Sequence, residues 1–214
     1  MLDPGKVIDI SVPLVDRIPT YPGLDPFIHE WTHSLNRGDK KSVSRISMSC
    51  HVGTHIDAPL HFVPGGAVLG EIGWEYLCGR ATVVEIPDSS EQVITESEIP
   101  GAGICDPIIL LKTSNSQLWK LGAFSPKYRY LDEKAARLLV SSGVRTLGFD
   151  YISVDPPGGP KPAHTVLLGA GTIIVEGLNL EPVRPGTYFF VCLPLAVPHS
   201  EAAPARAILI PHER

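Results

Sequence analysis

The chain has 214 residues, of which 43% are hydrophobic and 19% are charged, and its formal net charge is −5. This balance is typical of a folded globular protein and excludes a disordered chain. The longest basic cluster is Lys40-Lys41, and no stretch approaches the roughly 18 apolar residues of a membrane span, so neither nucleic-acid binding nor membrane insertion is expected. The N-terminus has no basic region followed by an apolar one, so we expect a cytoplasmic protein whose four cysteines are free thiols.

The first part of the chain predicts strands separated by tight turns. Mixed or alternating apolar and polar residues favour strands over residues 6–12 and 27–33, on either side of the turn signal Tyr-Pro-Gly at 21–23. Residues 42–50 alternate apolar side chains with serines and arginine, which predicts a half-buried strand. That strand would lead directly into His51.

The rest of the chain predicts alternating strands and helices. The near-continuous apolar run over 106–113 is typical of a strand buried on both faces. Residues 131–143 form the clearest predicted helix, Gly143 can end it, and a strand over 144–150 follows. Further strands are expected over 81–87, 172–177, 187–194 and 205–211, and helical segments over 70–79, from Thr95, and from Pro162 to about Leu168. About nine strands and three or four helices predict a single α/β domain over residues 1–214 with a mixed, buried sheet.

Three histidines and an aspartate lie within residues 51–61. Divalent transition metals bind neutral imidazole nitrogens and carboxylate oxygens at about 2 Å. His51 and His55 are four residues apart, which would place both on one face of a helical turn. Asp57 can add an oxygen, because Pro59 favours an exit from the helical conformation. We interpret these three residues as most of one metal site, rather than as unrelated core or surface residues.

His61 lies six residues beyond His55, past Ala58-Pro59, so it does not share the same helical face. A histidine beside a metal but not bound to it can act as a general acid and base, because its pKa lies near neutral pH. The residues alone leave a second possibility equally open, in which His61 is a further ligand or orients one.

Two more polar residues could converge on this site. His164 opens the helix expected from Pro162, and Glu176 ends the apolar strand over 172–177. A buried carboxylate without a partner is costly, and a metal would be a suitable partner, although local sequence alone favours a cap and a strand-end charge. Asp150 and Asp155 are either acids that orient histidines or turn and capping residues, and the second interpretation is favoured.

The segment from His51 through Phe62, H-x-G-T-H-x-D-x-P-x-H-F, resembles the signature of the cyclase family of metal-dependent hydrolases. That family includes bacterial-type kynurenine formamidases and isatin hydrolases. The likeness extends over nearly the whole chain, through segments 21–23, 147–155, 164–178, 193–195 and 204–209. The chain is therefore identified as a member of this family.

The resemblance implies a swivelling β/β/α fold, two divalent metals per subunit, and a homodimer or higher homo-oligomer. The implied ligands are His51, His55 and Asp57 for one metal and His164 for the other, with Asp57 or Glu176 as the bridge. His61 would be the proton donor and acceptor. Zinc is the first expectation for the metal and manganese the second, because both accept histidine and carboxylate ligands.

The implied activity is hydrolysis of a small amide by a metal-activated water, and most specifically that of an arylformamidase. Such an enzyme converts N-formylkynurenine to kynurenine and formate in tryptophan breakdown. Tyr21 stands where kynurenine formamidases typically have tryptophan, and it would stack on the ring of the substrate. One alternative is hydrolysis of a cyclic amide or lactone, as in isatin hydrolases. Another is metal-dependent binding of a small molecule without turnover, although a pure binder would not need His61.

Overall fold

The largest sheet of the molecule closes on itself. The computed structural model describes residues 4–100, 104 and 106–211. Eight strands lie in the order β1-β12-β11-β5-β7-β9-β10-β4, and β4 also pairs with β12. Closure leaves few free strand edges, which would otherwise invite pairing with other chains. The strands are β1 Ile8–Asp9, β4 His55–Asp57, β5 Cys78–Glu85, β7 Ile108–Lys112, β9 Thr146–Phe149, β10 Ile173–Glu176, β11 Gly186–Pro194 and β12 Ala202–Pro211.

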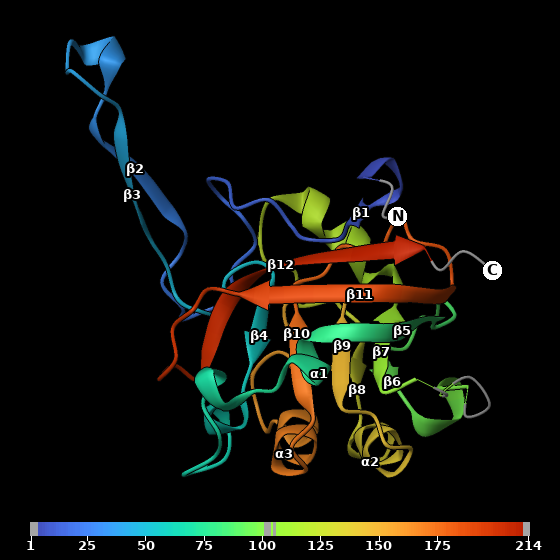
Figure 1. The fold of residues 1–214 in the computed structure, drawn as a ribbon. Coiled ribbons are helices and arrows are strands. Elements are labelled where there is room, and N and C mark those ends of the chain that lie inside the picture. The colour runs from blue at the N-terminus through green and yellow to red at the C-terminus, as the bar shows by residue number, and fades with distance from the viewer. Residues whose placement is uncertain (1–3, 101–103, 105, 212–214) are drawn as a thin grey trace.

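The sheet is mixed, as predicted. Strands β5, β7, β9 and β10 pair in parallel, whereas β4, β11 and β12 pair antiparallel with their neighbours. Three α-helices lie among the described residues: α1 Trp74–Leu77, α2 Glu133–Ser141 and α3 Pro162–Gly169. In Figure 1, α2 and α3 lie next to each other below the central strands. The predicted α/β class is therefore confirmed.

The central strands are buried on both faces. Ile108 and Leu110 of β7 join one apolar cluster, which fills the space enclosed by the sheet. Ile109 and Leu111 point the other way, into a second cluster that α2 and α3 cover. This arrangement explains why β7 reads as a continuous apolar run.

The helical segments follow the local signals closely. Asp132 caps α2 through the backbone N–H of Ala135, and Gly143 follows the helix with φ 80°. The capping box at Thr95 is present and opens a short 3₁₀ helix. The helix expected over 70–79 is shorter, because β5 begins at Cys78. The 3₁₀ helices are η1 Pro4–Lys6, η2 Leu35–Arg37, η3 Pro59–His61, η4 Leu69–Glu71, η5 Glu96–Glu98 and η7 Ser114–Leu121. Within the described ranges, no helix has the length and apolar content needed to cross a bilayer.

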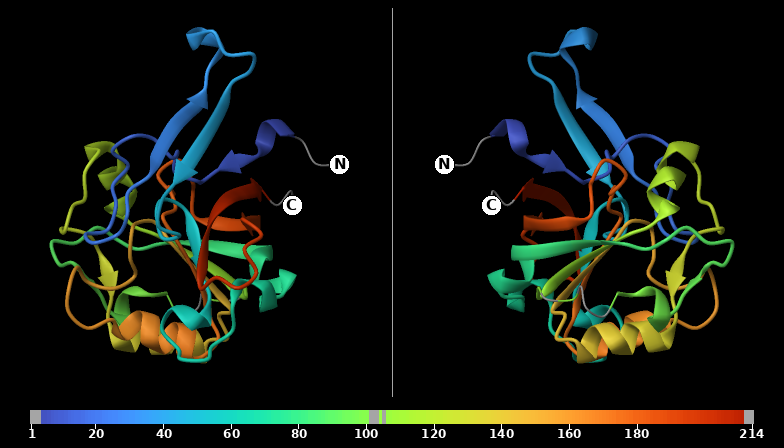
Figure 2. Two further views of the ribbon diagram at one scale, coloured as in Figure 1. Left: turned by 90° about the vertical axis from the view of Figure 1, so that its left-hand side faces the viewer. Right: turned by 90° about the vertical axis from the view of Figure 1, so that its right-hand side faces the viewer.

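Strands β2 Ile28–His33 and β3 Val43–Ser47 form a hairpin, here called the arm, that projects away from the body (Figures 1 and 2). The strand expected over 42–50 is present as β3, but the expectation that it is half-buried is wrong, because every residue of β3 is exposed. The alternation instead gives the arm two unlike faces. A third pairing, between β6 Val93–Ile94 and β8 Tyr130–Leu131, forms a small separate sheet.

The expected helical turn over residues 51–55 is also wrong. His55 opens β4, which is hydrogen-bonded to β10 on one side and to β12 on the other. This pairing with two distant strands fixes an extended backbone. His55 and Asp57 therefore share a face through the two-residue period of a strand, not through a helical repeat. Three of the cysteines, Cys50, Cys78 and Cys192, are free, and Cys105 lies outside the described residues.

Candidate metal centre

The predicted ligands meet where β4 and β10 pair. His55 lies directly opposite Glu176, and Asp57 lies opposite Ile174, so these side chains share one face of the sheet. Ile174 belongs to the apolar cluster beneath the helices, which places this face toward α3. His164, in the first turn of α3, completes the group from that side. The structure thus brings β4 together with α3 and β10, two consecutive elements that follow it by more than 100 residues in the sequence.

Two glycines allow these segments to approach closely. A Cβ atom on Gly177 would lie 2.0 Å from the backbone oxygen of Gly53, and both glycines have positive φ, 72° and 70°. Thr54 links these segments, because its hydroxyl donates to Gly177 O at 2.6 Å and accepts from Val12 N at 2.9 Å. These contacts hold the turn that follows His51 against the end of β10.

Asp155 orients His164. Its carboxylate accepts the backbone N–H groups of Ala163 and His164, each at 2.9 Å, and lies 2.6 Å from Nδ1 of the His164 ring. With Nδ1–H donating to Asp155, Nε2 faces Glu176 Oε1 at 3.3 Å and Asp57 Oδ2 at 3.6 Å. Asp155 thus both caps the helix and orients the histidine, which are the two roles considered for it.

His55 is oriented in the same way by the backbone. Its Nδ1 lies 2.8 Å from Gly53 O, and its Nε2 faces Asp57 Oδ1 at 3.5 Å and Glu176 Oε2 at 3.6 Å. The other Glu176 oxygen accepts the N–H of Val154 at 2.7 Å. Both histidines therefore direct Nε2 toward the same pair of carboxylates.

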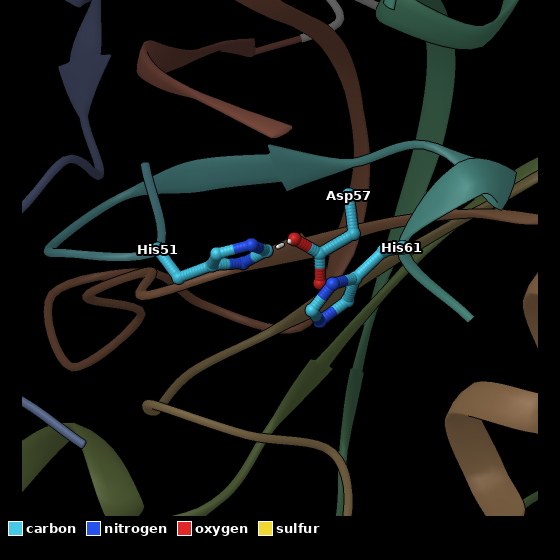
Figure 3. Close-up of side chains that lie close together, drawn as sticks. All are labelled: His51, Asp57 and His61. Atoms are coloured by element: carbon cyan, nitrogen blue, oxygen red, sulfur yellow. Dashed lines mark ion pairs between the residues drawn. The ribbon is translucent and has the colours of Figure 1, made fainter. Parts of the chain in front are cut away.

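His51 and His61 approach Asp57 from the open side (Figure 3). His51 Nδ1 lies 2.9 Å from Asp57 Oδ1, and the ring centres of His51 and His61 are 4.1 Å apart. The geometry forms two possible ligand groups that share Asp57, one with His51 and His61 and the other with His55 and Glu176. His61 is thus close enough to be either a ligand or a proton carrier.

Buried atoms without hydrogen-bond partners indicate a cation site. Of the buried side-chain nitrogen and oxygen atoms in the described ranges, four have no hydrogen-bond partner, and three of these are His55 Nε2 and both oxygens of Asp57. A carboxylate that is fully buried and not hydrogen-bonded costs several kcal/mol unless a cation compensates it. Imidazole nitrogens and carboxylate oxygens are the donors that zinc and manganese accept. The residues present therefore fit a divalent metal.

The pKa of His61 shifts in the opposite direction from the pKa values of His51 and His164. Burial opposes protonation of His51 and His164, but the carboxylates beside them, Asp57 for His51 and Glu176 for His164, raise the pKa of each ring. Burial likewise opposes the charged form of Asp57, yet the neighbouring histidines, His55 first, hold its pKa well below the usual range. For His61 burial prevails over the charge of Asp57 and lowers the pKa to about 4. The centre thus attracts positive charge but leaves His61 neutral.

The open side of the centre is a pocket of about 170 Å³, suited to a small molecule. Tyr21, His51, His61, His164 and Glu176 all line it, so the predicted substrate residue lies beside the predicted ligands. Phe62 also lines the pocket and stacks on His164, with ring centres 4.7 Å apart.

Sequence reasoning missed Glu201 and placed Asp150 correctly. Glu201 Oε1 lies 3.4 Å from His51 Nε2, because β12 begins next to β4. No local pattern marks Glu201, since its position depends on the pairing of strands about 145 residues apart. Asp150 accepts hydrogen bonds from Thr113 and Ser116, which ties η7 to the end of β9. Burial raises the pKa of Asp150 to about 7.

Comparisons with known proteins agree with this picture. A family model described as "Putative cyclase" matches residues 8–156. A curated relative named kynurenine formamidase, from Bordetella avium (strain 197N), is 32% identical over 95% of this chain and 97% of its own length. A solved structure described as a potential metal-dependent hydrolase with cyclase activity superposes with a TM-score of 0.83 at 34% identity, covering 98% of this chain and 99% of that one. Isatin hydrolase A from Labrenzia aggregata superposes with a TM-score of 0.81 at 25% identity, covering 97% and 94%.

Proposed function

Because the chain belongs to the cyclase family, we propose that it is a metal-dependent amide hydrolase, and most specifically an arylformamidase acting on N-formylkynurenine. The observation that carries this proposal is the convergence of the buried side chains of His55 and Asp57 with His164 and Glu176 beside one pocket. The names of the curated relatives support the choice of substrate.

The proposed ligands follow from the distances. Oδ1 of Asp57 faces His51 and His55, whereas its Oδ2 faces His164, so Asp57 would be shared by the two groups of residues that would hold two metals. Glu176 reaches both His55 and His164 and would complete the inner site. Zinc is our first expectation for the metal and manganese the second. A cytoplasmic location also stays a prediction.

The metal ligands, His61 and Phe62 would each have a different role in the reaction. A divalent metal held there lowers the pKa of a water molecule and polarises a carbonyl oxygen. His61, on the open side of Asp57, is placed to accept a proton from the attacking water and to return it to the leaving nitrogen. The water oxygen would first form the new C–O bond, and the C–N bond would break after the leaving nitrogen has received the proton, giving formate and an aryl amine. Phe62 holds the ring of His164 in place by stacking on it.

The arm supports the predicted homodimer. His29, Trp31 and Ile46 share one of its faces by strand register, and the Trp31 side chain is 53% exposed. An isolated two-stranded hairpin is marginally stable in water, so a second copy covering this face would stabilise it. We expect a mass in solution of twice that of the chain, measured by light scattering after gel filtration. A monomeric mass would contradict the homodimer and leave the metal centre unaffected.

A substrate pair tests the proposed function. Zinc-loaded or manganese-loaded protein is expected to hydrolyse N-formylkynurenine, followed by the absorbance of kynurenine, and to hydrolyse isatin at least tenfold more slowly. Preference for isatin would favour the cyclic-amide alternative. Absence of turnover with both substrates while metal is bound would contradict the hydrolase proposal and favour a binding protein.

A further inference from the structure

Lys161 places a positive charge in the wall of the same pocket. It is the N-cap residue of α3, three positions before His164, and it lines the pocket together with Tyr21 and His61. The side chain is partly buried rather than free in solvent. Holding a lysine at such a position costs conformational entropy and some desolvation, so its partners are informative.

Those partners leave the charge of Lys161 unbalanced. Its ammonium group donates to the hydroxyl oxygen of Tyr21 at 2.8 Å and to the backbone oxygen of Pro156. Both acceptors are neutral, and across residues 4–100, 104 and 106–211 no carboxylate forms an ion pair with Lys161. The acids of the pocket belong to the metal centre, where a cation would neutralise them. A lysine ammonium has three donors, and two of them are used here.

Tyr21 is arranged as a donor at the same place. Its hydroxyl oxygen accepts from Lys161 Nζ and from the backbone N–H of Gly158 at 2.9 Å. Because both lone pairs are then occupied, the hydroxyl proton is directed elsewhere. One N–H of Lys161 and the O–H of Tyr21 are therefore available to a ligand. Two such donors, one of them on a positive charge without an ion-pair partner, favour an anion.

We propose that Lys161 and Tyr21 form a subsite for a carboxylate of the substrate, next to the metal centre. This inference rests on the proposed function and extends it, because N-formylkynurenine carries a carboxylate on its amino-acid side chain. The hydroxyl end of Tyr21 would bind this group, while its ring forms the pocket wall. Lys161 would then set specificity without taking part in bond cleavage.

The test compares two formamides that differ only in the carboxylate, N-formylkynurenine and its decarboxylated analogue N-formylkynuramine. For the metal-loaded protein, we expect kcat/KM to be roughly 10- to 100-fold higher for the acid, the range for a hydrogen bond to a charged group. In Lys161→Met the ratio of the two kcat/KM values should fall to about one. The change should come mainly from a higher KM for N-formylkynurenine and less from kcat. Lys161→Arg should keep part of the preference, and Lys134→Met, on the exposed surface of α2, should keep all of it.

A binding measurement separates this inference from the proposed function. Calorimetry with the two amines, kynurenine and kynuramine, should show tighter binding of kynurenine in the wild type and equal binding in Lys161→Met. If neither formamide is hydrolysed but this difference persists, the proposed function fails and the subsite stands. If hydrolysis occurs without any preference for the carboxylate, or if Lys161→Met weakens both compounds equally, the subsite is overturned.

Discussion

Replacing His61 by glutamine is expected to lower kcat by about 10²- to 10⁴-fold while the metal content of the protein stays at the wild-type level. Glutamine has a similar size and can hydrogen-bond, but it cannot exchange a proton near neutral pH. His61 sits at the end of η3 with its ring against His51 and open to the pocket, so the substitution disturbs no core contact. Metal analysis by mass spectrometry and steady-state kinetics on the same preparation check both parts of the prediction.

This experiment also decides between the two roles of His61. If His61 is a ligand, as its distance to His51 and Asp57 allows, metal content should fall together with kcat. An unchanged rate would remove His61 from the reaction altogether. His199→Gln is a suitable control, because His199 is exposed and lies in the loop before β12.

Replacing Asp57 by asparagine is expected to abolish metal binding at the candidate centre. Asp57 is the residue common to both ligand groups, and neither of its oxygens has a hydrogen-bond partner. Asparagine keeps the shape but removes the charge and places N–H donors where a cation would sit. Since a bound metal contributes several kcal/mol to catalysis, kcat/KM should fall by about 10³-fold or more.

The stability of the metal-free protein gives a second readout. The neighbouring histidines hold the pKa of Asp57 low and so stabilise its buried charge, and Asp57→Asn removes one partner of these ion pairs, which should lower the free energy of unfolding near neutral pH. Asp57→Asn should therefore unfold at a lower temperature than metal-free wild type, and added metal should no longer raise that temperature. Asp88→Asn, at an exposed position, serves as the control. A normal metal-dependent increase in Asp57→Asn would show that the metal binds elsewhere.

The sequence predicted the elements well wherever a signal was local. The helical segment that opens at Thr95, the stop at Gly143 and the double-sided burial of β7 all follow from neighbouring residues. The helical turn at His51 failed because the conformation of β4 depends on its two strand neighbours, which lie more than 100 residues away. Pairing of distant strands overrides local spacing.

The arm shows a second limit of pattern reasoning. Alternation in residues 42–50 correctly indicated a strand with unlike faces, but it does not reveal what covers the apolar one. The ion pair between Glu30 and Arg45, at 2.8 Å, marks the polar face. The pattern alone suggested burial, whereas the arm projects away from the core of the molecule.

The candidate centre was predictable in part. His51, His55, Asp57 and His61 are adjacent in sequence, and the structure keeps them together. Their convergence with His164 and Glu176 was implied by the family resemblance and is seen in the geometry. Glu201 and Lys161 have no local signal, because their positions depend on strand order and on the loop before α3.

The measurement that tests the central claim most directly is a titration of metal-free protein with zinc or manganese. Bound metal and hydrolysis of N-formylkynurenine are followed in the same samples. We predict that activity is absent without metal, rises with occupancy and stops rising when the centre shared by Asp57 is filled. Full activity in the absence of metal, or metal binding that saturates without any effect on hydrolysis, would contradict the account.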